Sequence, residues 1–313
     1  MKKNFLSLFD GMSGGQYSAE ELGLDIGEYY ASEIYKKAID VTNKNFPNTI
    51  QLGDVNEYKN WNIDFKKIDI VMFGFPCRNL SRAVINNYDH NQGLKGEKSS
   101  LFYTALEILK KCKEENPNVL FLCENVESMK KEDKDIITEC LGVEPIMIDS
   151  SLLTAQDRKR YYWTNINNGE IPKPNDQGII LNDIIMSKQE VNDLEIKHKY
   201  SYWYDKPFTY NGDDKKVQAT LEIKGHDILK RVYNLNNKCA TLTSCRGGNL
   251  QKKVYQDQKC RKLTPIEYER LQGFYDNYTD GVSVTNRYNM LGDGWTVPVI
   301  KHIFSFLPDD WKK

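Results

Sequence analysis

The sequence predicts an α/β protein built on a mainly parallel β-sheet with helices on both faces. In the first half of the chain, short apolar runs alternate with longer amphipathic stretches, which is the pattern of consecutive βαβ units. Residues 166–260 lose this regularity and are rich in Asn, Asp, Lys and Tyr. Because 313 residues suffice for one large and one smaller domain, we expect the smaller one in this irregular region.

The predicted strands and helices of the first half follow one another in alternation. Parallel sheets of this kind bind ligands beyond the carboxyl ends of their strands, so the turns after strands are the candidate site positions. Strands are predicted over Phe5–Phe9, Glu28–Ser32, Ile68–Phe73, Val119–Cys123 and Pro145–Ile148. Helices are predicted over Gln16–Gly23, Tyr35–Phe46, Leu101–Lys113 and Lys130–Leu141.

The end of the chain returns to a helical pattern. A helix is predicted over Leu263–Gln272, with Thr264 as N-cap and Pro265 at the first helical position. A last apolar helix is predicted over Pro298–Phe306. We therefore expect a main domain over residues 1–180, a smaller domain over 181–262, and a segment over 263–313 that returns to the main domain.

The net charge of −1 hides a basic segment. Residues 196–262 contain 15 Lys or Arg against 6 Asp or Glu, an excess of nine positive charges. Such a segment suits a polyanion, but a solvated lysine-rich face explains the charge equally well. The chain has no apolar run of the ~18 residues that span a bilayer, and Asp10 interrupts the start before a signal peptide could form. We expect a cytoplasmic protein whose seven cysteines, which form no CxxC pairs, are mostly buried free thiols.

A glycine-rich run follows the first predicted strand and opens the first predicted helix. Its glycines let a ligand approach the backbone, and the helix N-terminus favours an anionic group. Glu33 ends the second strand, where a carboxylate can accept both hydroxyls of a ribose, and Asp54 can bond an adenine amino group. This pattern alone fits many nucleotide-binding proteins, including nicotinamide-dependent enzymes. The run is Phe9-Asp10-Gly11-Met12-Ser13-Gly14-Gly15.

Three further clusters follow strands or lie on strand-like segments. In Gly74-Phe75-Pro76-Cys77-Arg78-Asn79-Leu80-Ser81, the proline directs the chain so that Cys77 could serve as a nucleophile, although a lone cysteine is more often a buried structural thiol. In Cys123-Glu124-Asn125-Val126, the carboxyl of Glu124 could bond a ring nitrogen or merely cap a helix. In Gln156-Asp157-Arg158-Lys159-Arg160, the two arginines could hold a phosphate or carbonyl, or form a solvated edge.

The order of these motifs resembles that of the DNA cytosine-5 methyltransferase family. The resemblance runs from Leu6 to Phe306, and only the irregular middle is not aligned by motif. The chain is short and has no reader domain, so we expect a bacterial or phage member. Two later runs complete the order, Arg261-Lys262-Leu263-Thr264-Pro265-x-Glu267 and Leu291-Gly292-x-x-Trp295. Details such as Phe9-Asp10-Gly11, Ala31-Ser32-Glu33, Gly53-Asp54-Val55, Ile148-Asp149 and Trp295-Thr296-Val297-Pro298 are most similar to the de novo branch.

The resemblance implies an S-adenosylmethionine-dependent, Rossmann-like fold with a seven-stranded sheet, and a base-flipping mechanism. Cys77 would attack C6 of a flipped-out cytosine, Glu124 would hold N3, and Arg158 and Arg160 would neutralise charge around the base. No metal is implied. The residues expected to bind S-adenosylmethionine are Phe9, Asp10, Gly11, Met12, Ser13, Gly14, Glu33, Ile34, Asp54, Val55, Asn56, Pro76, Leu101, Asp293, Gly294 and Trp295.

By the same resemblance, the irregular region would hold the target-recognition domain, ending near Thr241-Leu242-Thr243 and Gly247-Gly248. The excess positive charge falls there, as contacts to DNA phosphates require. The implied partner is double-stranded DNA, with the chain a monomer and a restriction endonuclease a candidate cognate enzyme. The expected DNA contacts are Arg78, Ser81, Thr243, Arg246, Gly247, Gly248, Lys252 and Lys253.

Two positions depart from the family pattern. Arg78 stands where most members have Gln and the de novo branch has Asn, and Asp293-Gly294 replaces a small polar pair. Arg78 bears on the loop beside the flipped base, and Asp293 on affinity for the donor. Two alternatives therefore stay open: a relative that methylates tRNA with the same residues, and a catalytically silent DNA-binding relative.

Overall fold

The computed structural model describes residues 2–81, 92–245 and 249–313. It divides into two compact units. The first unit contains the chain up to Ile148, Lys159–Lys173 and Val299–Lys313, and the second contains Asp149–Arg158 and Pro174–Pro298. These units are defined by packing rather than by what they bind, so the functional boundaries expected at 180 and 262 stay predictions.

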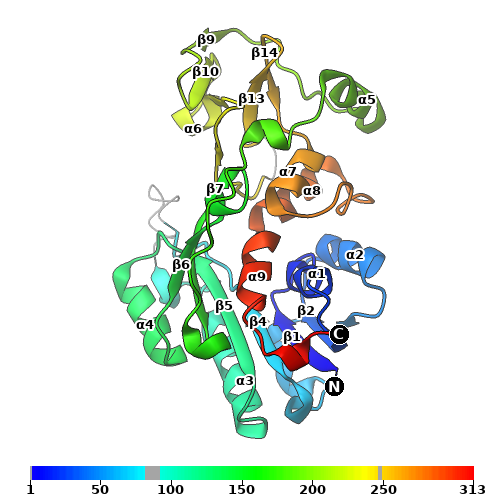
Figure 1. Ribbon diagram of the computed structural model, residues 1–313, viewed down its shortest axis with the longest axis vertical. Coiled ribbons are helices and arrows are strands. Elements are labelled where there is room, and N and C mark those ends of the chain that lie inside the picture. The colour runs from blue at the N-terminus through cyan, green and yellow to red at the C-terminus, as the bar shows by residue number, and fades with distance from the viewer. Residues whose placement is uncertain (1, 82–91, 246–248) are drawn as a thin grey trace. The chain divides into compact units, whose positions relative to one another are not determined.

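The first unit is built on a seven-stranded sheet, as predicted (Figure 1). Strand pairing is parallel from β3 through β2, β1 and β4 to β5, whereas β8 runs antiparallel to β5. The strand order is β3-β2-β1-β4-β5-β8-β6. The strands are β1 (Lys3–Leu8), β2 (Ile26–Ser32), β3 (Ile50–Gln51), β4 (Ile70–Phe73), β5 (Leu120–Val126), β6 (Ile146–Asp149) and β8 (Lys159–Thr164).

Helices cover both faces of this sheet because successive strand residues point to opposite sides. Leu6 and Leu8 of β1 lie in one core cluster with Phe102 of α3. Phe5 points the other way and packs against Phe304 and Trp311, with ring centroids 6.4 and 5.8 Å apart. The C-terminal residues therefore pack on the face of the sheet to which Phe5 points. The helices are α1 (Gly14–Glu21), α2 (Lys36–Asn45), α3 (Leu101–Glu115), α4 (Lys131–Leu141) and α9 (Val297–Phe304), all close to their predicted positions.

The second unit contains a five-stranded sheet of order β14-β13-β11-β10-β9 and a two-stranded ladder of β7 with β12. Only a small apolar cluster, Ala219, Leu221, Val232 and Cys260, lies at the centre of the larger sheet. The strands are β7 (Gln156–Asp157), β9 (Phe208–Tyr210), β10 (Val217–Leu221), β11 (Arg231–Tyr233), β12 (Cys239–Ala240), β13 (Lys253–Gln256) and β14 (Lys259–Lys262). The helices are α5 (Lys188–His198), α6 (Asp227–Lys230), α7 (Pro265–Gln272) and α8 (Val284–Asp293).

The predicted start of α7 is confirmed. The hydroxyl of Thr264 accepts from the Glu267 backbone N–H, the Glu267 side chain accepts from the Thr264 N–H, and Pro265 is the first helical residue. Helices α5 and α8 were not predicted. In the part of the chain that the structure describes, no helix is long and apolar enough to cross a membrane.

Candidate active site

The glycine turn after β1 is held in a strained shape beside open space. Phe9, Gly11 and Ser13 all have left-handed φ angles, between 55° and 60°, and two of them are not glycines. Such conformations cost about 1–3 kcal/mol each for non-glycine residues and cluster at functional sites. A Cβ added at Gly11 would meet no atom within 4 Å. The turn therefore leaves space beside the Gly11 backbone, shortly before α1 begins at Gly14.

The carboxyl of Asp10 is buried inside this turn. Its oxygens accept hydrogen bonds from the Ser13 hydroxyl and, at 2.9 Å, from the hydroxyl of Tyr29. Burial raises the pKa of Asp10 to about 6, against the lowering effect of these hydrogen bonds. Asp10 consequently changes its charge close to neutral pH.

Glu33 fixes the turn from the end of the neighbouring strand. Its Oε2 accepts from the Gly11 N–H at 2.8 Å, and its Oε1 accepts from the N–H groups of Ile34 and Tyr35 at 2.8 and 2.7 Å. A carboxylate oxygen can accept two hydrogen bonds, so Oε2 retains capacity for a ligand hydroxyl. The Ile34 side chain beside it is 72% exposed.

Asp54 follows β3 at the same edge of the sheet. Its Oδ1 accepts from the Asn56 N–H at 2.9 Å and so caps a short 3-10 helix, Val55–Asn60. The preceding Gly53 has φ 78°, and a Cβ there would also meet no atom within 4 Å. Met12 and Val55, by contrast, are buried, and only their backbones could face a ligand.

The loop that carries Cys77 is fastened at two consecutive carbonyls. Asn125 of β5 donates its side-chain N–H to the Phe75 carbonyl at 3.0 Å, and Ser99 donates its hydroxyl to the Pro76 carbonyl at 3.1 Å. The N–H groups of Leu80 and Ser81 both bond the Cys77 carbonyl at 2.9 Å. The sequence motif contained Asn125 but gave it no role, and nothing marked Ser99.

Partial exposure separates Cys77 from most other cysteines. Cys77 and Cys140 are half-buried, and the remaining five are buried, as expected for structural thiols. Burial raises the pKa of the buried thiols, to about 12 for Cys112 and Cys239 and to about 11 for Cys245 and Cys260. A nucleophile must be reachable as a thiolate, which these buried groups are not.

Strand pairing brings Glu124 to the edge that bears the Cys77 loop. Strands β4 and β5 pair in parallel with Phe73 opposite Cys123, so Glu124 and the 74–77 turn both follow this pair. Arg160 of the antiparallel strand β8 forms an ion pair with Glu124, 2.9 Å from Nε to Oε1. Both side chains are largely buried, 14% and 12% exposed, where such a pair is only weakly screened by water.

Arg158 does not share the partner of Arg160. It belongs to the second unit, and its side chain is 4% exposed. Its guanidinium donates to the carbonyls of Leu242, Gly292 and Gly294 at 2.9, 3.2 and 2.9 Å. The structure therefore does not bring the two arginines to one group, as the sequence pattern suggested. Asp293, Gly294 and Trp295 also lie in the second unit.

Two of the expected DNA contacts have buried side chains. Lys252 and Lys253 are 5% and 1% exposed, and Lys253 Nζ donates to the carbonyls of Asn249 and Gln251 at 2.7 and 2.8 Å. Burial lowers the pKa of Lys253 to about 7. The Lys253 amine is thus already bonded to the backbone, and a role for either lysine at a DNA phosphate stays a prediction that this burial does not favour. Arg78 and Thr243 are exposed and Ser81 is half-buried, while Arg246, Gly247 and Gly248 lie outside the described residues.

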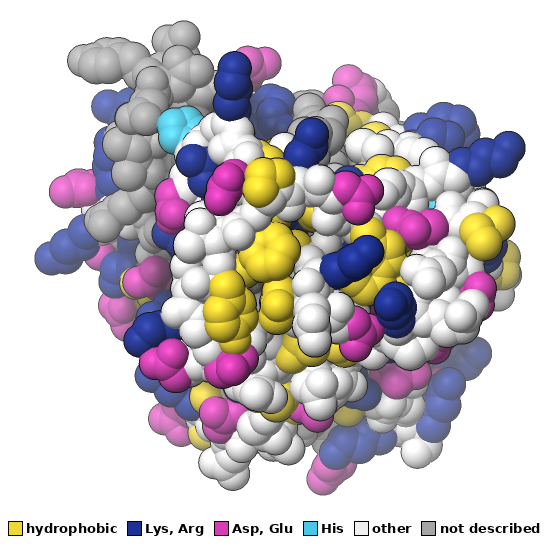
Figure 2. Space-filling model, turned by 90° about the horizontal axis from the view of Figure 1, so that it is seen from above, with side chains coloured by type: hydrophobic (Ala, Val, Ile, Leu, Met, Phe, Trp, Pro, Cys, Tyr) yellow, Lys and Arg dark blue, Asp and Glu magenta, His cyan; other side chains and the backbone are white. Residues whose placement is uncertain are grey.

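The basic segment also presents less free charge than its sequence suggests. Lys215, Arg231 and Lys238 pair with nearby Asp side chains at 2.6–3.1 Å, Lys216 pairs with Asp157, and Arg261 is in a fully buried ion pair. On the face shown in Figure 2, Lys and Arg side chains are interspersed with Asp and Glu around a group of hydrophobic side chains.

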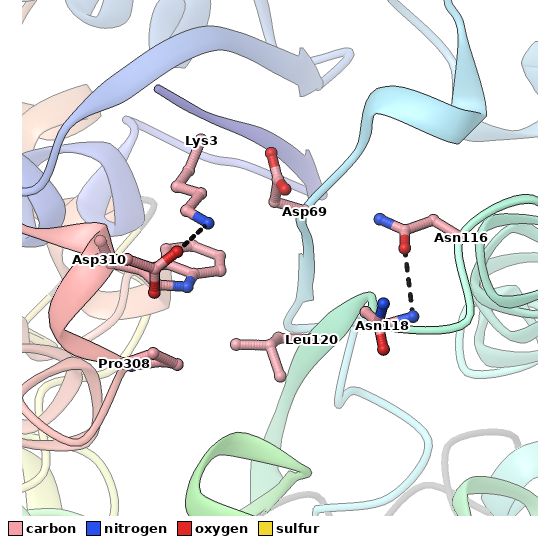
Figure 3. Close-up of a pocket in the computed structure, with 8 residues that line it drawn as sticks. Lys3, Asp69, Asn116, Asn118, Leu120, Pro308 and Asp310 are labelled. Carbon is pink, nitrogen blue, oxygen red and sulfur yellow. Dashed lines mark hydrogen bonds and ion pairs between the residues drawn. The ribbon is translucent and has the colours of Figure 1, made fainter. Parts of the chain in front are cut away.

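A hollow of about 360 Å³ lies at the opposite edge of the seven-stranded sheet (Figure 3). Lys3, Asp69 and Leu120 stand at the amino ends of β1, β4 and β5, and Lys3 is ion-paired with Asp310 at 2.6 Å. Because ligands of parallel sheets bind at carboxyl ends, this hollow is distinct from the candidate site. Its lining is completed by Asn116, Asn118, Pro308 and Trp311.

The fold and these turns define the class of methyltransferase-like α/β proteins. The solved methyltransferase EhMeth of Entamoeba histolytica is similar over 100% of both chains, with a TM-score of 0.69 and 17% identity. The Dnmt2 methyltransferase of Schizosaccharomyces pombe is similar over 98% of both chains, with a TM-score of 0.63 and 15% identity. At these identities the likeness shows the fold alone.

The sequence comparisons identify the family. The model for C-5 cytosine-specific DNA methylases matches residues 3–308, and the chain belongs to this family. It is 25% identical to the type II methyltransferase M.HhaI of Haemophilus parahaemolyticus, over 96% of this chain and 92% of that one. It is 26% identical to M.HpaII of Haemophilus parainfluenzae, over 96% and 87%. It is 23% identical to the orphan methyltransferase M.SPBetaI of Bacillus phage SPbeta, over 98% and 97%.

Proposed function

We propose that this chain transfers a methyl group from S-adenosylmethionine to carbon 5 of cytosine in double-stranded DNA, with Cys77 as nucleophile. Membership of the C-5 cytosine-specific family supports the reaction. The observation that carries the assignment of residues is the carboxyl edge of β4 and β5. There a half-buried thiol on a loop anchored by Asn125 lies on the same edge as the Glu124–Arg160 pair.

The glycine turn, Glu33 and Asp54 fit the donor. Open space beside Gly11 and Gly53 leaves room for a nucleoside, and the exposed Ile34 offers apolar surface to its base. Glu33 Oε2 can accept from a ribose hydroxyl, and an ionised Asp10 favours a ligand with positive charge. When bound, S-adenosylmethionine supplies an electrophilic methyl group on a sulfonium.

The protein's own groups make cytosine C5 reactive. The Cys77 thiolate adds to C6 and breaks the C5–C6 π bond, whose electrons become available at C5. A proton shared between the Glu124 carboxyl and N3 offsets the negative charge that this addition brings to the ring. After C5 has gained the methyl group, a base removes its proton. That electron pair reforms the C5–C6 double bond and expels the thiolate. Arg160 keeps Glu124 in place and offsets its charge.

We further propose that the first unit carries this chemistry and that the second unit reads DNA. Among the residues expected to touch DNA, exposed Thr243 lies in the second unit and fits this division, whereas exposed Arg78 belongs to the first unit, on the loop that carries Cys77. Lys252 and Lys253 are left out because of their burial.

The decisive experiment compares Cys77→Ser with Cys140→Ser, the other half-buried cysteine. We expect Cys77→Ser to lower methyl transfer to duplex DNA by at least about 10³-fold, with folding and donor binding retained, and Cys140→Ser to stay within about twofold. The wild type should form a donor-dependent covalent complex with DNA containing 5-fluorocytosine, since fluorine cannot leave as a proton does.

Turnover by Cys77→Ser would refute the assigned nucleophile. Methyl transfer to tRNA but not to duplex DNA would place the chain with the RNA-modifying relatives. Absence of both activities and of the covalent complex would show a catalytically silent protein.

A further inference from the structure

The C-terminus of α8 has an unusual set of partners. The last carbonyls of a helix have no partner within the helix and must find one elsewhere. Here the Leu291 carbonyl accepts from the Gln272 side chain at 2.5 Å, and the Gly292 carbonyl accepts from Arg158. The Gly294 carbonyl accepts from both, at 3.1 and 2.9 Å. A guanidinium at this position also complements the negative end of the helix dipole.

The same guanidinium binds a second segment, 241–243, which follows β12. Arg158 donates to the Leu242 carbonyl at 2.9 Å, while the Leu242 N–H donates to the side-chain oxygen of Gln156 at 3.3 Å. Gln156 in turn donates to Gln272 at 2.9 Å. Arg158 thus binds both segment 241–243 and the end of α8, a contact that we call the joint. Gln156 links the same two segments indirectly, through Gln272.

The two segments are also packed without space between them. A Cβ on Gly292 would lie 2.2 Å from the carbonyl carbon and oxygen of Thr243, a contact that no side chain tolerates. On the far side of the joint, the Ser244 hydroxyl bonds the Asn289 side chain at 2.6 Å. Any displacement of one segment must therefore move the other or break these contacts.

We propose that Arg158 is a positioning residue that locks segment 241–243 to the turn 292–295, so that DNA recognition and donor binding are energetically coupled. This rests on the proposed function and on two expectations from the sequence, that 241–243 lies at the end of the target-recognition domain and that 293–295 contacts the donor. Lysine cannot replace Arg158, because its donors radiate from one atom, whereas Nη1 and Nη2 here serve carbonyls on both segments.

The test uses Arg158→Ala and the milder Arg158→Lys in the full-length protein. Arg270→Lys is the matched control, since Arg270 lies in the same unit and also binds a backbone carbonyl, that of Ile184. Amide hydrogen exchange is measured at residues 241–244 and 290–296. We expect exchange to accelerate at least about tenfold in both segments in the Arg158 variants, and in neither segment in the control.

The second measurement is the affinity for cognate duplex DNA with and without S-adenosylhomocysteine. If this compound tightens DNA binding in the wild type, the factor should fall toward one in both Arg158 variants, because coupling between two sites is reciprocal and is lost with the joint. Cys77-dependent covalent trapping at saturating donor is measured beside it, to report separately on any role of Arg158 at the target base.

If amide exchange is unchanged and covalent trapping is lost in the Arg158 variants, the proposal is wrong and Arg158 acts on the target base instead. Faster exchange with an unchanged coupling factor, or no coupling in the wild type, would also overturn it. Because amide exchange requires no turnover, the joint is tested even if the wild type methylates nothing.

Discussion

The two units hold themselves together by different means. The first buries apolar residues on both faces of its sheet, such as Leu6 and Phe73 on one face and Phe5 on the other, and its Glu124–Arg160 pair lies at the edge. The second also buries apolar residues, such as Leu271 and Tyr288, and in addition buries whole ion pairs. Arg261–Glu267 and Arg287–Glu269 are 0–1% exposed, with separations of 2.6 and 2.8 Å. The difference teaches that charge buried inside an apolar core makes a unit sensitive to the loss of a single charged partner.

Removing Glu267 should give the largest loss of stability. In Glu267→Ala the Arg261 guanidinium stays buried without its bidentate partner, and the N–H groups of Thr264 and Met186 lose their acceptor. We expect a loss of about 3–5 kcal/mol, the usual cost of an orphaned buried charge. Chemical unfolding, followed by amide exchange in each unit, measures it.

Glu190→Ala is the matched control. Glu190 and Ser187 form the same capping box at the start of α5, but on the surface and without a buried arginine. Its loss should cost only about 1 kcal/mol. If the two variants are equally stable, the ionic core of the second unit does not stabilise it in the way the contrast implies.

The same contrast explains what the sequence could predict. Strands β1, β4 and β5 are short apolar runs, which the sequence pattern predicts. The glycine turn, Cys77 and Glu124 lie at the ends of these strands, so their order along the chain also follows from the pattern. Helix α8 was missed because its buried side includes Arg287 and Asn289, which interrupt the apolar periodicity. Helix α5 was also missed, although Ser187 and Glu190 have the spacing of a capping box.

Hydrogen-bond partners that lie far apart in the sequence could not be predicted. The pair Lys252-Lys253 is indistinguishable in sequence from a surface pair, and its burial depends on the backbone carbonyls of Asn249 and Gln251 and on the surrounding second unit. The carbonyls that Arg158 binds are 84–136 residues away, and backbone carbonyls leave no trace in a sequence.

A smaller effect is expected from Asp10, a strongly perturbed carboxyl of the first unit. Burial raises the pKa of Asp10 to about 6, so its charge is present above that pH and lost below it. If the ionised form favours the cationic donor, donor affinity measured by calorimetry should fall up to about tenfold between pH 7 and pH 5, equivalent to about 1.4 kcal/mol. Asp10→Asn should bind the donor weakly, and its affinity should not depend on pH between pH 5 and pH 7.

Stability should change in the opposite direction. Because the folded-state pKa is raised above the ordinary Asp value of 3.8, the folded protein binds the extra proton between pH 4 and 6. The contribution of Asp10 to stability is therefore full below pH 4 and lost as the pH rises through 6. Asp10→Asn should flatten this slope. A wild-type donor affinity that is constant from pH 5 to 7 would show that Asp10 does not act on the donor's charge.

The smallest effect should come from the apolar core of the first unit. Ile108 of α3 is fully buried in the cluster that includes Leu6, Phe73 and Phe121. Ile108→Val removes one methylene and no hydrogen bond, so we expect a loss of about 0.5–1.5 kcal/mol that does not vary with pH. Urea unfolding at pH 5 and pH 8 checks both statements. A loss as large as that of Glu267→Ala would mean that the first unit depends on tight packing as strongly as the second depends on its ion pairs. The two units would then differ in the chemistry of their cores but not in how much stability a single substitution removes.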